Sequence, residues 1–392
     1  QSGVDLVLAA GMSSSSPSTA AEGSTVKPTS IRWGIIGLGD VCVKKSGPAF
    51  YKCKGSELVA VMRRTPGKAG EFAARVPGGG CTGYDNIDDF LRHPELDAVY
   101  VSTRPGTHLE ICEKVAEAGK ACYVEKPVGR CAEETEKIVK VFDKAKLPLY
   151  TAYISRAYER TQALRKFLAG GAIGDELLKV SYKLIGSGGA RDMLGDLPWR
   201  LDAKQSGGGL IMDVGCHVID RIHYLCGPLV NVKGSAMNKN STSVRVEDFV
   251  QLTANIGDGG NLEAMSHSED VSVEMTWDFE SSEAPLDELK FIGPKGHIKM
   301  SAMSFAPVEV YDEGGKLIKT QSFEPPEHTA QNMIQAVTND LLGIEKEDFL
   351  SVGDNTIRTS RVLDAVLNSY YGGREIGYWS RTNWPGSPNF RM

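Results

Sequence analysis

The chain has 392 residues, 41% of them hydrophobic, 24% charged and 8% aromatic, which is the composition of a globular protein with room for two full-sized cores. Its formal net charge of −6 and the lack of a dense run of Lys or Arg exclude the basic footprint of a nucleic-acid-binding protein. No stretch of the sequence approaches the roughly 18 consecutive apolar residues that a membrane-spanning helix requires.

The eight cysteines are scattered, mostly inside apolar segments, and none belongs to a C-x-x-C pair. This pattern favours buried free thiols in a reducing compartment over a disulfide framework, and it predicts a cytoplasmic protein. Together with the charge balance, it predicts small-molecule partners rather than nucleic acid or a membrane.

The first thirty residues differ from the rest of the chain. The segment SSSSPSTAAEGSTVKPTS is rich in Ser, Thr and Pro and cannot build a core, so residues 1–30 are expected to form a disordered leader. The residues before Met12 resemble a vector-derived tag, with Met12 as the natural start. The alternative is a targeting peptide, but transit peptides are rich in Arg as well as Ser, and no Arg precedes Arg32.

From residue 31 the sequence alternates short apolar runs with helical patterns. The runs IRWGIIGL, ELVAVMRR, LDAVYVST and ACYVEKP each predict a buried strand, and HLEICEKVAEAGK has apolar residues at helical spacing and ends at Gly119. Buried parallel strands that alternate with helices are typical of a doubly wound α/β domain, which is expected to span residues 31–150.

The turn after the first expected strand carries part of a dinucleotide fingerprint. Gly37 and Gly39 match the first two glycines of G-x-G-x-x-G, of which one permits a tight turn and the next lets the backbone approach a pyrophosphate. Cys42 occupies the third position. In a βαβ unit at the head of a domain, this loop predicts a bound dinucleotide. The residues expected to hold it are Gly37, Leu38, Gly39, Asp40 and Val41.

The second expected strand ends in Arg63 and Arg64, about 25 residues beyond the glycine loop. A domain that binds NAD has Asp or Glu at this point to hold the ribose 2′-hydroxyl, whereas a 2′-phosphate needs cations. The alternative is a solvated pair of arginines at a strand end. The charge pattern favours NADP over NAD as the cofactor.

After residue 150 the pattern changes to successive strands. A helix is expected near 157–170, followed by strand-like runs: ELLKVSYKLI, LVNVKGSAMN, EDFVQLTANI, NLEAMSHS, EMTWDF, ELKFIGPKGHIKM and PVEVYDEGGKLIKT. Turn segments such as Pro-Lys-Gly and Glu-Gly-Gly join several of these runs and suit hairpins. Residues 151–380 are therefore expected to form an α+β domain with a mainly antiparallel sheet, followed by a tail over residues 381–392. Two late helices, near 328–342 and 353–371, are expected to pack on the first domain.

The segment GGGLIMDVGCHVID, residues 207–220, carries titratable side chains in otherwise apolar surroundings. Asp213, His217 and Asp220 fall within about 60° of one another on a helix, and burying them costs several kcal/mol unless they are paired or used. Three interpretations are open: a buried hydrogen-bonded pair, a metal site built on the i, i+4 pair, or the working surface of an enzyme. No third ligand at a suitable spacing supports the metal, so no metal is predicted.

Four motifs, in this order along the chain, resemble those of the Gfo/Idh/MocA oxidoreductase family. They are GIIGLGDV at the first strand, T-x-P-x-x-H in TRPGTH, Glu-Lys-Pro after the fourth strand, and WRLDAKQSGGGLIMDVGCHVID. The resemblance spans about residues 31–380. It implies a Rossmann domain followed by an α/β domain with an open antiparallel sheet, and a homo-oligomer that pairs through the open sheet faces.

The resemblance also assigns roles to individual residues. It implies that Lys126 lies beside the nicotinamide and polarises the carbonyl, that His217 exchanges the hydroxyl proton, and that Asp213 orients its neighbours. Further residues are expected at the cofactor: Ser102, Thr103, Arg104, His108, Glu125, Lys126, Trp199 and Arg200. Substrate contacts are expected from Lys126, Tyr153, Arg156, Asp213 and His217, with Arg191, Trp199 and Tyr378 as further candidates. Asp220 is expected to be a structural partner within the second domain.

The leading hypothesis is an NADP-dependent oxidoreductase that transfers a hydride between the nicotinamide and a C–OH or C=O of a sugar, cyclitol or related polyol. A histidine supplies a base near pH 7 without a large pKa shift, and Lys126 follows a strand at the edge where open α/β sheets bind ligands. One alternative is a redox-neutral enzyme that keeps NAD bound and cleaves or isomerises a glycoside. The other is a non-catalytic regulator. The arginine pair argues against the first, and the intact Lys126 and His217 argue against the second.

Overall fold

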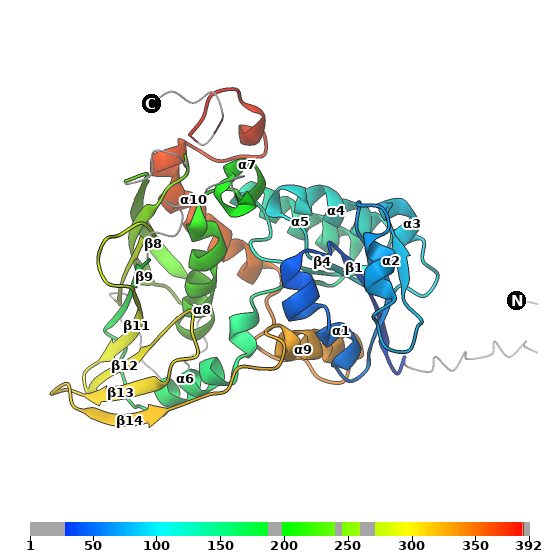
Figure 1. The fold of residues 1–392 in the computed structure, drawn as a ribbon. Coiled ribbons are helices and arrows are strands. Elements are labelled where there is room, and N and C mark those ends of the chain that lie inside the picture. Colours follow the sequence, from blue (N-terminus) through cyan, green and yellow to red (C-terminus); the bar gives the residue numbers. More distant parts are fainter. Residues whose placement is uncertain (1–27, 187–197, 240–244, 259–270, 386, 388–392) are drawn as a thin grey trace, which may run out of the picture.

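The computed structural model describes residues 28–186, 198–239, 245–258, 271–385 and 387 (Figure 1). The expected leader before residue 28, including Met12, lies outside the described residues, and so do Arg191 and the expected strand NLEAMSHS. Along the described helices, none is long and apolar enough to cross a membrane. All eight cysteines are free thiols, and seven of them are buried.

The first domain is built on a parallel sheet of six strands in the order β3-β2-β1-β4-β5-β6. The strands are β1 (Ile31–Ile36), β2 (Ser56–Met62), β3 (Thr82–Tyr84), β4 (Ala98–Val101), β5 (Ala121–Val124) and β6 (Leu149–Thr151). The strand order reverses between β1 and β4, and ligands bind at such a switch point, beyond the carboxyl ends of the strands. This confirms the expected Rossmann architecture.

Helices cover both faces of this sheet, as the doubly wound pattern requires. The elements are η1 (Cys42–Ser46), α1 (Ala49–Lys52), α2 (Lys68–Ala73), α3 (Ile87–Leu91), α4 (Pro105–Glu117) and α5 (Ala132–Ala145). One apolar core lies under α1 and contains Trp33 and Phe50, and the other lies under α3, α4 and α5 and contains Phe90 and Ile138. Local sequence fixes the helix starts, since the Asn86 side chain caps α3 and a proline begins α4.

The second domain contains an eight-stranded sheet in the order β14-β13-β12-β11-β7-β10-β9-β8. The strands are β7 (Lys179–Ile185), β8 (Leu229–Met237), β9 (Phe249–Ile256), β10 (Ser272–Asp278), β11 (Leu286–Gly293), β12 (Gly296–Met300), β13 (Val308–Asp312) and β14 (Leu317–Gln321). Every neighbouring pair is antiparallel except β7 and β10, which run parallel. The expected, mainly antiparallel sheet is confirmed.

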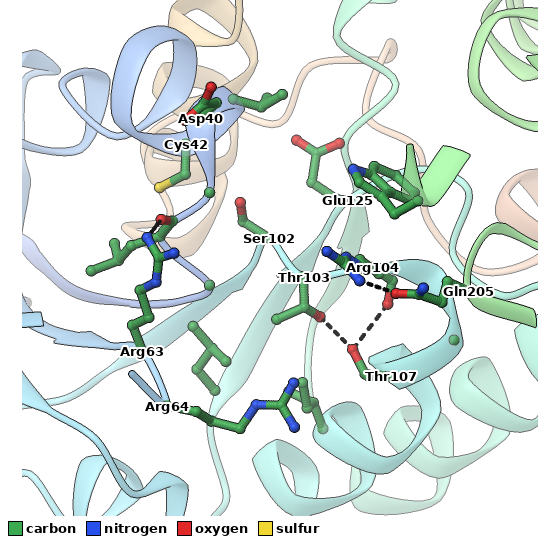
Figure 2. Close-up of a pocket in the computed structure, with 18 of the residues that line it drawn as sticks. Asp40, Cys42, Arg63, Arg64, Ser102, Thr103, Arg104, Thr107, Glu125 and Gln205 are labelled. Carbon is green, nitrogen blue, oxygen red and sulfur yellow. Dashed lines mark hydrogen bonds between the residues drawn. The ribbon is translucent and has the colours of Figure 1, made fainter. Parts of the chain in front are cut away.

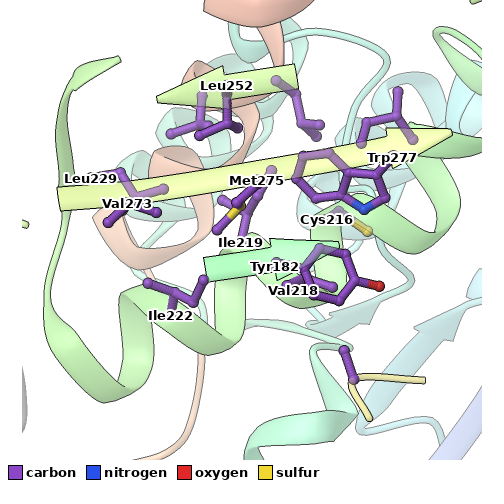
Figure 3. Close-up of a cluster of buried hydrophobic side chains, with 14 of the residues drawn as sticks. Tyr182, Cys216, Val218, Ile219, Ile222, Leu229, Leu252, Val273, Met275 and Trp277 are labelled. Carbon is purple, nitrogen blue, oxygen red and sulfur yellow. The ribbon is translucent and has the colours of Figure 1, made fainter. Parts of the chain in front are cut away.

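Two helical segments connect the two sheets: η2 (Ile154–Ala157) and α6 (Glu159–Ala169). The segments between β7 and β8 carry the titratable stripe: η3 (Trp199–Leu201), α7 (Ala203–Ser206), η4 (Ile211–Gly215) and α8 (Cys216–Cys226). Figure 3 shows α8 packed against the sheet, with Ile219 and Ile222 facing Met275 on β10. The segment η4 is a π-helical turn that leads directly into α8. The apolar side of α8 is therefore fixed by the sheet, which sets where its polar side chains point.

The two late helices differ in what they pack on. Helix α9 (Gln331–Leu341) joins the core under α1 through Met333 and Ile334, as expected. Helix α10 (Asp354–Tyr371) was expected on the first domain as well, and this is wrong for most of its length. Val362 and Leu367 belong to the core of the second sheet, and only Ile357, near the start of α10, joins a core of the first domain. Its apolar stripe lies over β8 and α8, so α10 bridges the two domains.

Truncating Trp277 on β10 should test how far the second domain depends on this core. Its indole is completely buried and packs against Tyr182, with ring centroids 5.4 Å apart. Trp277→Ala should lower the free energy of unfolding by about 3–5 kcal/mol, because it leaves a cavity that the sheet cannot close. The measurement is urea denaturation followed by circular dichroism. Leu317→Ala on β14 is the control, since its side chain is 46% exposed and its loss should cost far less.

Candidate active site

A cavity of about 1120 Å³ lies between the carboxyl ends of the first sheet and residues 199–213 of the second domain (Figure 2). Its lining includes the ends of β1, β2, β4 and β5, which meet at the switch point of the sheet. The expected cofactor residues that line it are Gly37, Leu38, Gly39, Asp40, Val41, Arg63, Arg64, Ser102, Thr103, Arg104, Glu125, Lys126, Trp199 and Arg200. The geometry thus gathers residues that are far apart in the sequence into one elongated site.

The glycine loop after β1 leaves room for a ligand. Gly37 has φ of 102°, and a Cβ there would lie 2.7 Å from the carbonyl oxygen of Ser102, so only glycine fits. A Cβ on Gly39 would meet nothing within 4 Å, so packing does not require glycine at this position. Because Gly39 lines the cavity, a side chain there would instead occupy space that a pyrophosphate needs. The loop therefore fits a dinucleotide.

The two arginines at the end of β2 have different surroundings. Arg63 donates from Nη1 to the carbonyl oxygen of Leu38 over 2.6 Å, which ties the end of β2 to the glycine loop. Arg64 is exposed, lines the cavity and makes no hydrogen bond or ion pair with the described residues. Of the two cations, Arg64 is consequently the one whose hydrogen-bonding capacity is unused.

Residues of the second domain close one side of the cavity. The Arg104 guanidinium donates to the Gln205 side chain, and Arg130 donates to the carbonyl oxygen of Lys204 over 3.0 Å. Figure 2 shows Arg104 and Gln205 meeting across this boundary. The contact of Arg104, which the sequence left open, is thus an interdomain one. Gln205 and Lys204 were not expected at the site: they lie inside the motif that begins at Trp199, but neither was singled out there.

Lys126 lines the cavity, and its ammonium is held by Asp213. Nζ donates to Oδ1 of Asp213 over 2.5 Å and to its backbone carbonyl over 3.0 Å, while Nε of Arg200 donates to Oδ2 over 2.7 Å. Burial opposes ionisation of Asp213, but the charges of Lys126 and Arg200 outweigh it and hold the pKa of the carboxyl well below its usual value. Burial likewise opposes the charge on Lys126, but Asp213 outweighs it and raises the pKa of the ammonium. Both groups are charged at neutral pH.

Glu125 lies beside this pair at the end of β5. Its Oε1 accepts from the Tyr100 hydroxyl over 2.5 Å, and its Oε2 accepts from the backbone N–H of Lys126 over 3.2 Å. Burial raises the pKa of Glu125, although Lys126 and the Tyr100 hydrogen bond oppose that shift. The carboxyl anchors the turn that presents Lys126.

His217 lies one turn after Asp213, where η4 passes into α8. Its ring is partly buried, and Nδ1 has no hydrogen-bond partner among the described residues. Burial and the nearby Lys126 charge lower the pKa of the imidazole well below its usual value, and Asp213 only partly opposes them. The expectation that this histidine works without a large pKa shift is therefore wrong. The imidazole is neutral at physiological pH, which is the form that accepts a proton.

Besides His217, the predicted site residues His108, Tyr153 and Arg156 do not line this cavity. His108 is fully buried, with its ring nitrogens 3.0 Å from the Val128 carbonyl and 3.2 Å from the Thr103 carbonyl, so it braces the neighbouring loops. Tyr153 is 1% exposed. Arg156 makes a bidentate ion pair with Asp220, with distances of 2.8 and 2.6 Å. Asp220 is thus a structural partner of Arg156, and the Arg156 guanidinium is already engaged in this ion pair.

Of the further substrate candidates in the described residues, Tyr378 also lies away from the cavity: it is buried and donates to the carbonyl oxygen of Tyr371 over 2.9 Å. Trp199 lines the cavity, with the Arg200 guanidinium 4.5 Å from its ring centroid. Gly106 and Thr107 line the cavity as well. They lie inside the T-x-P-x-x-H motif, so its spacing could have revealed them.

The metal interpretation of the stripe has no support in the geometry. Among the described residues there is no group of three or more His, Cys, Asp or Glu side chains that could hold an ion. Both carboxylate oxygens of Asp213 already accept from cations, Oδ1 from Lys126 and Oδ2 from Arg200.

Removing Asp213 should reveal the dependence of Lys126 on its counter-ion. Asp213→Ala should lower the free energy of unfolding at pH 7 by roughly 2–3 kcal/mol, less than for a fully buried pair because 26% of the Asp213 side chain is exposed. Because the folded pKa of Asp213 is lowered, this difference should shrink as the pH falls below the ordinary carboxyl value of about 3.9. Denaturant titrations at several pH values measure it.

Two further variants control this experiment. Asp213→Ala combined with Lys126→Met should recover part of the loss, because no unpaired ammonium then remains. Asp89→Ala removes an exposed ion pair with Arg92 and should change stability by less than about 0.5 kcal/mol. A loss in Asp213→Ala that is no larger than in Asp89→Ala would contradict the ion-pair account.

Comparison with known proteins gives the same division of the chain. Residues 31–153 match the oxidoreductase family with an NAD-binding Rossmann fold, and residues 161–299 match the Gfo/Idh/MocA C-terminal domain. An oxidoreductase of Formosa agariphila is 29% identical over 306 residues, which are 78% of this chain and 89% of the relative. A dTDP-3,4-didehydro-2,6-dideoxy-alpha-D-glucose 3-reductase of Saccharopolyspora spinosa is 30% identical over 233 residues, which are 59% of this chain and 67% of the relative.

The fold of this chain also matches a solved structure, over nearly the whole length of that structure. The aldose-aldose oxidoreductase from Caulobacter crescentus, complexed with glycerol, superposes with a TM-score of 0.71 at 23% identity, covering 87% of this chain and 97% of the other. Both domains and their order agree with these matches. The chain therefore belongs to the Gfo/Idh/MocA oxidoreductase family.

Proposed function

We propose that the protein is an NADP-dependent oxidoreductase that interconverts a C–OH and a C=O group of a sugar, cyclitol or related polyol. The observation that carries this proposal is the contact of Lys126 with Asp213 in a cavity that the glycine loop also lines, with His217 one helical turn after Asp213 and close enough for both charges to act on its ring. The names of the relatives, a dideoxyglucose-nucleotide reductase and an aldose-aldose oxidoreductase, support a sugar-like substrate.

The charges of the site suit this chemistry. The nicotinamide, when bound, supplies or accepts the hydride. Lys126, held as an ammonium by Asp213, can donate a hydrogen bond to the reacting oxygen and stabilise the negative charge that develops there. His217 is neutral and can take the hydroxyl proton during oxidation or return it during reduction. Arg200 holds the other oxygen of Asp213, so the carboxylate keeps its orientation toward Lys126.

The preference for NADP rests on Arg64. It is an exposed cation on the cavity with no other hydrogen-bond or ion-pair partner among the described residues, and a 2′-phosphate is the group of NADP that needs one. Arg63 contributes by holding the carbonyl of Leu38, which positions the loop for either dinucleotide.

Cofactor binding tests this division of roles. Arg64→Ala should weaken NADPH binding at least tenfold while NADH binding changes less than twofold, because only NADPH carries the phosphate. Arg63→Ala should weaken both, because it releases the Leu38 carbonyl. The measurement is cofactor fluorescence titration, with Arg92→Ala on the surface after α3 as the matched control. NADH binding as tight as NADPH in the wild-type protein, or NAD retained through purification, would instead favour the redox-neutral glycoside chemistry.

Activity variants test the catalytic roles. His217→Ala should lower kcat for NADPH-linked reduction of carbonyl sugars by about 10²–10⁴-fold, the usual share of a positioned acid–base group. Its NADPH affinity should change less than twofold, because His217 does not line the dinucleotide cavity. Lys126→Met should lower kcat as strongly. His297→Ala on β12 is the control and should retain activity, and equal loss in both histidine variants would contradict the role of His217.

The proposal extends to assembly as a homo-oligomer. The edge strands of the second sheet, β8 and β14, expose apolar side chains, of which Leu317 is 46% and Ile318 57% exposed. Light scattering of the purified protein gives the oligomer mass directly.

A further inference from the structure

Two arginines are buried side by side in the second domain without a direct anionic partner. Arg160, on α6, and Arg221, on α8, are each 2% exposed. Arg160 donates to the carbonyl oxygens of Ser301 and Ser304, and Arg221 donates from Nη1 to the carbonyl oxygen of Ala302 over 3.1 Å. The Nε atoms of both arginines are buried and have no partner among the described residues. Both cations thus point at one turn, whose carbonyls carry only partial charge.

The nearest carboxylates are already engaged. Asp220 has both oxygens on Arg156. Asp287 accepts from the Tyr182 hydroxyl over 3.1 Å, and its other three donors belong to the turn over residues 301–303. Asp287 attracts both buried arginines from a distance, but no arginine of the described chain hydrogen-bonds to it.

The pKa values of both arginines are lowered, as expected for buried cations without a hydrogen-bonded anion. Burial and the neighbouring charge of Arg221 lower the pKa of Arg160 to about 9. Burial likewise lowers the pKa of Arg221. An ion pair with a carboxylate has the opposite effect, as in Arg156, whose pKa is raised by Asp220 despite burial.

This arginine pair adjoins the reaction centre. Arg221 follows His217 by four residues on the same helix, so their Cβ atoms lie roughly 5–6 Å apart on one face. The charge of Arg221 acts on the His217 ring. Tyr158, at the start of α6, feels both buried arginines as well as Glu125 and Lys126. The positive pair therefore lies one helical turn beyond the groups proposed to handle the reacting oxygen.

We propose that Arg160 and Arg221 form an oxyanion-binding end of the substrate site, which holds a carboxylate or phosphate ester of the substrate one helical turn from the reacting carbon. The inference rests on the proposed function and narrows its substrate class from polyols in general to acidic sugar derivatives. A bidentate or shared contact with an oxyanion would satisfy the guanidinium groups that the turn carbonyls satisfy only in part.

A purely structural role does not account for the pair equally well. The turn over residues 301–303 is already fixed by Asp287 through two backbone N–H groups and the Ser301 hydroxyl. Two additional buried cations are a costly way to hold the same carbonyls, since each loses its hydration without gaining a hydrogen-bonded counter-ion. Asp287 attracts them only from a distance, and Arg160 has in addition the Phe305 ring, whose centroid lies 5.0 Å from its guanidinium carbon.

Binding of matched acidic and neutral sugars tests the inference. The full-length protein, with and without saturating NADPH, is titrated calorimetrically with D-glucuronate, D-gluconate and glucose 6-phosphate, and with the neutral D-glucose and D-glucitol. At least one acid should bind ten times more tightly than its neutral counterpart. Carboxylate and phosphate probes separate the two oxyanion sources. No preference for any acid over its neutral counterpart would overturn the inference.

Variants test whether the arginine pair causes the preference for acidic sugars. Arg221→Met, which keeps an unbranched apolar stem and removes the guanidinium, should abolish the acid preference, whereas Arg221→Lys, which keeps the charge, should retain part of it. Arg361→Met, which removes an exposed arginine paired with Glu136 on the surface, should leave the preference intact. An acid preference that survives in a folded Arg221→Met protein, judged by circular dichroism, would overturn the inference. Failure of the proposed function is distinguishable, because it appears as absence of NADPH binding and of NADPH oxidation in the same samples.

Discussion

The ion pair between Lys126 and Asp213 is the interaction on which the rest of the site depends. Lys126 lies just after β5, the neighbour of β4 in the parallel sheet, and Asp213 lies on the π-helical turn of the second domain, so the pair spans the domain boundary. Neither group would stay charged in its partly buried position alone. The same contact therefore keeps both side chains ionised and joins the first domain to the second.

The second domain contributes to this geometry through its core. The apolar face of α8 packs on the sheet beneath it, and that packing orients the polar face, on which His217 and Arg221 lie. Helix α10 adds a second connection between the domains, because its buried side chains belong to the hydrophobic cores of both. Rigid packing far from the cavity thus positions the few side chains that face it.

Much of the fold and of the candidate site could be predicted from the sequence. Long apolar runs predicted the main strands, and glycine spacing predicted Gly37 in a cofactor loop. The family resemblance implied that Lys126 and Asp213 lie at the same site, and both line the cavity. The strands β3 and β6 escaped prediction because three residues carry no periodicity. Gln205 escaped because only the folded contact with Arg104 brings it to the cavity. The lowered pKa of His217 escaped because it depends on burial and on a lysine ninety-one positions earlier in the chain.

The π-helical turn over Ile211–Gly215 has a consequence for how the site tolerates change in length. A π turn accommodates about one residue more than an α turn, and it frees backbone groups that an α-helix would use internally. Here the carbonyl of Asp213 accepts from Nζ of Lys126. Loss of a single residue from this turn would let the segment relax into a regular helix and rotate Asp213 by about 100° relative to α8. The site is therefore far more sensitive to a one-residue deletion in this turn than to most substitutions there, because its register rests on a helical irregularity.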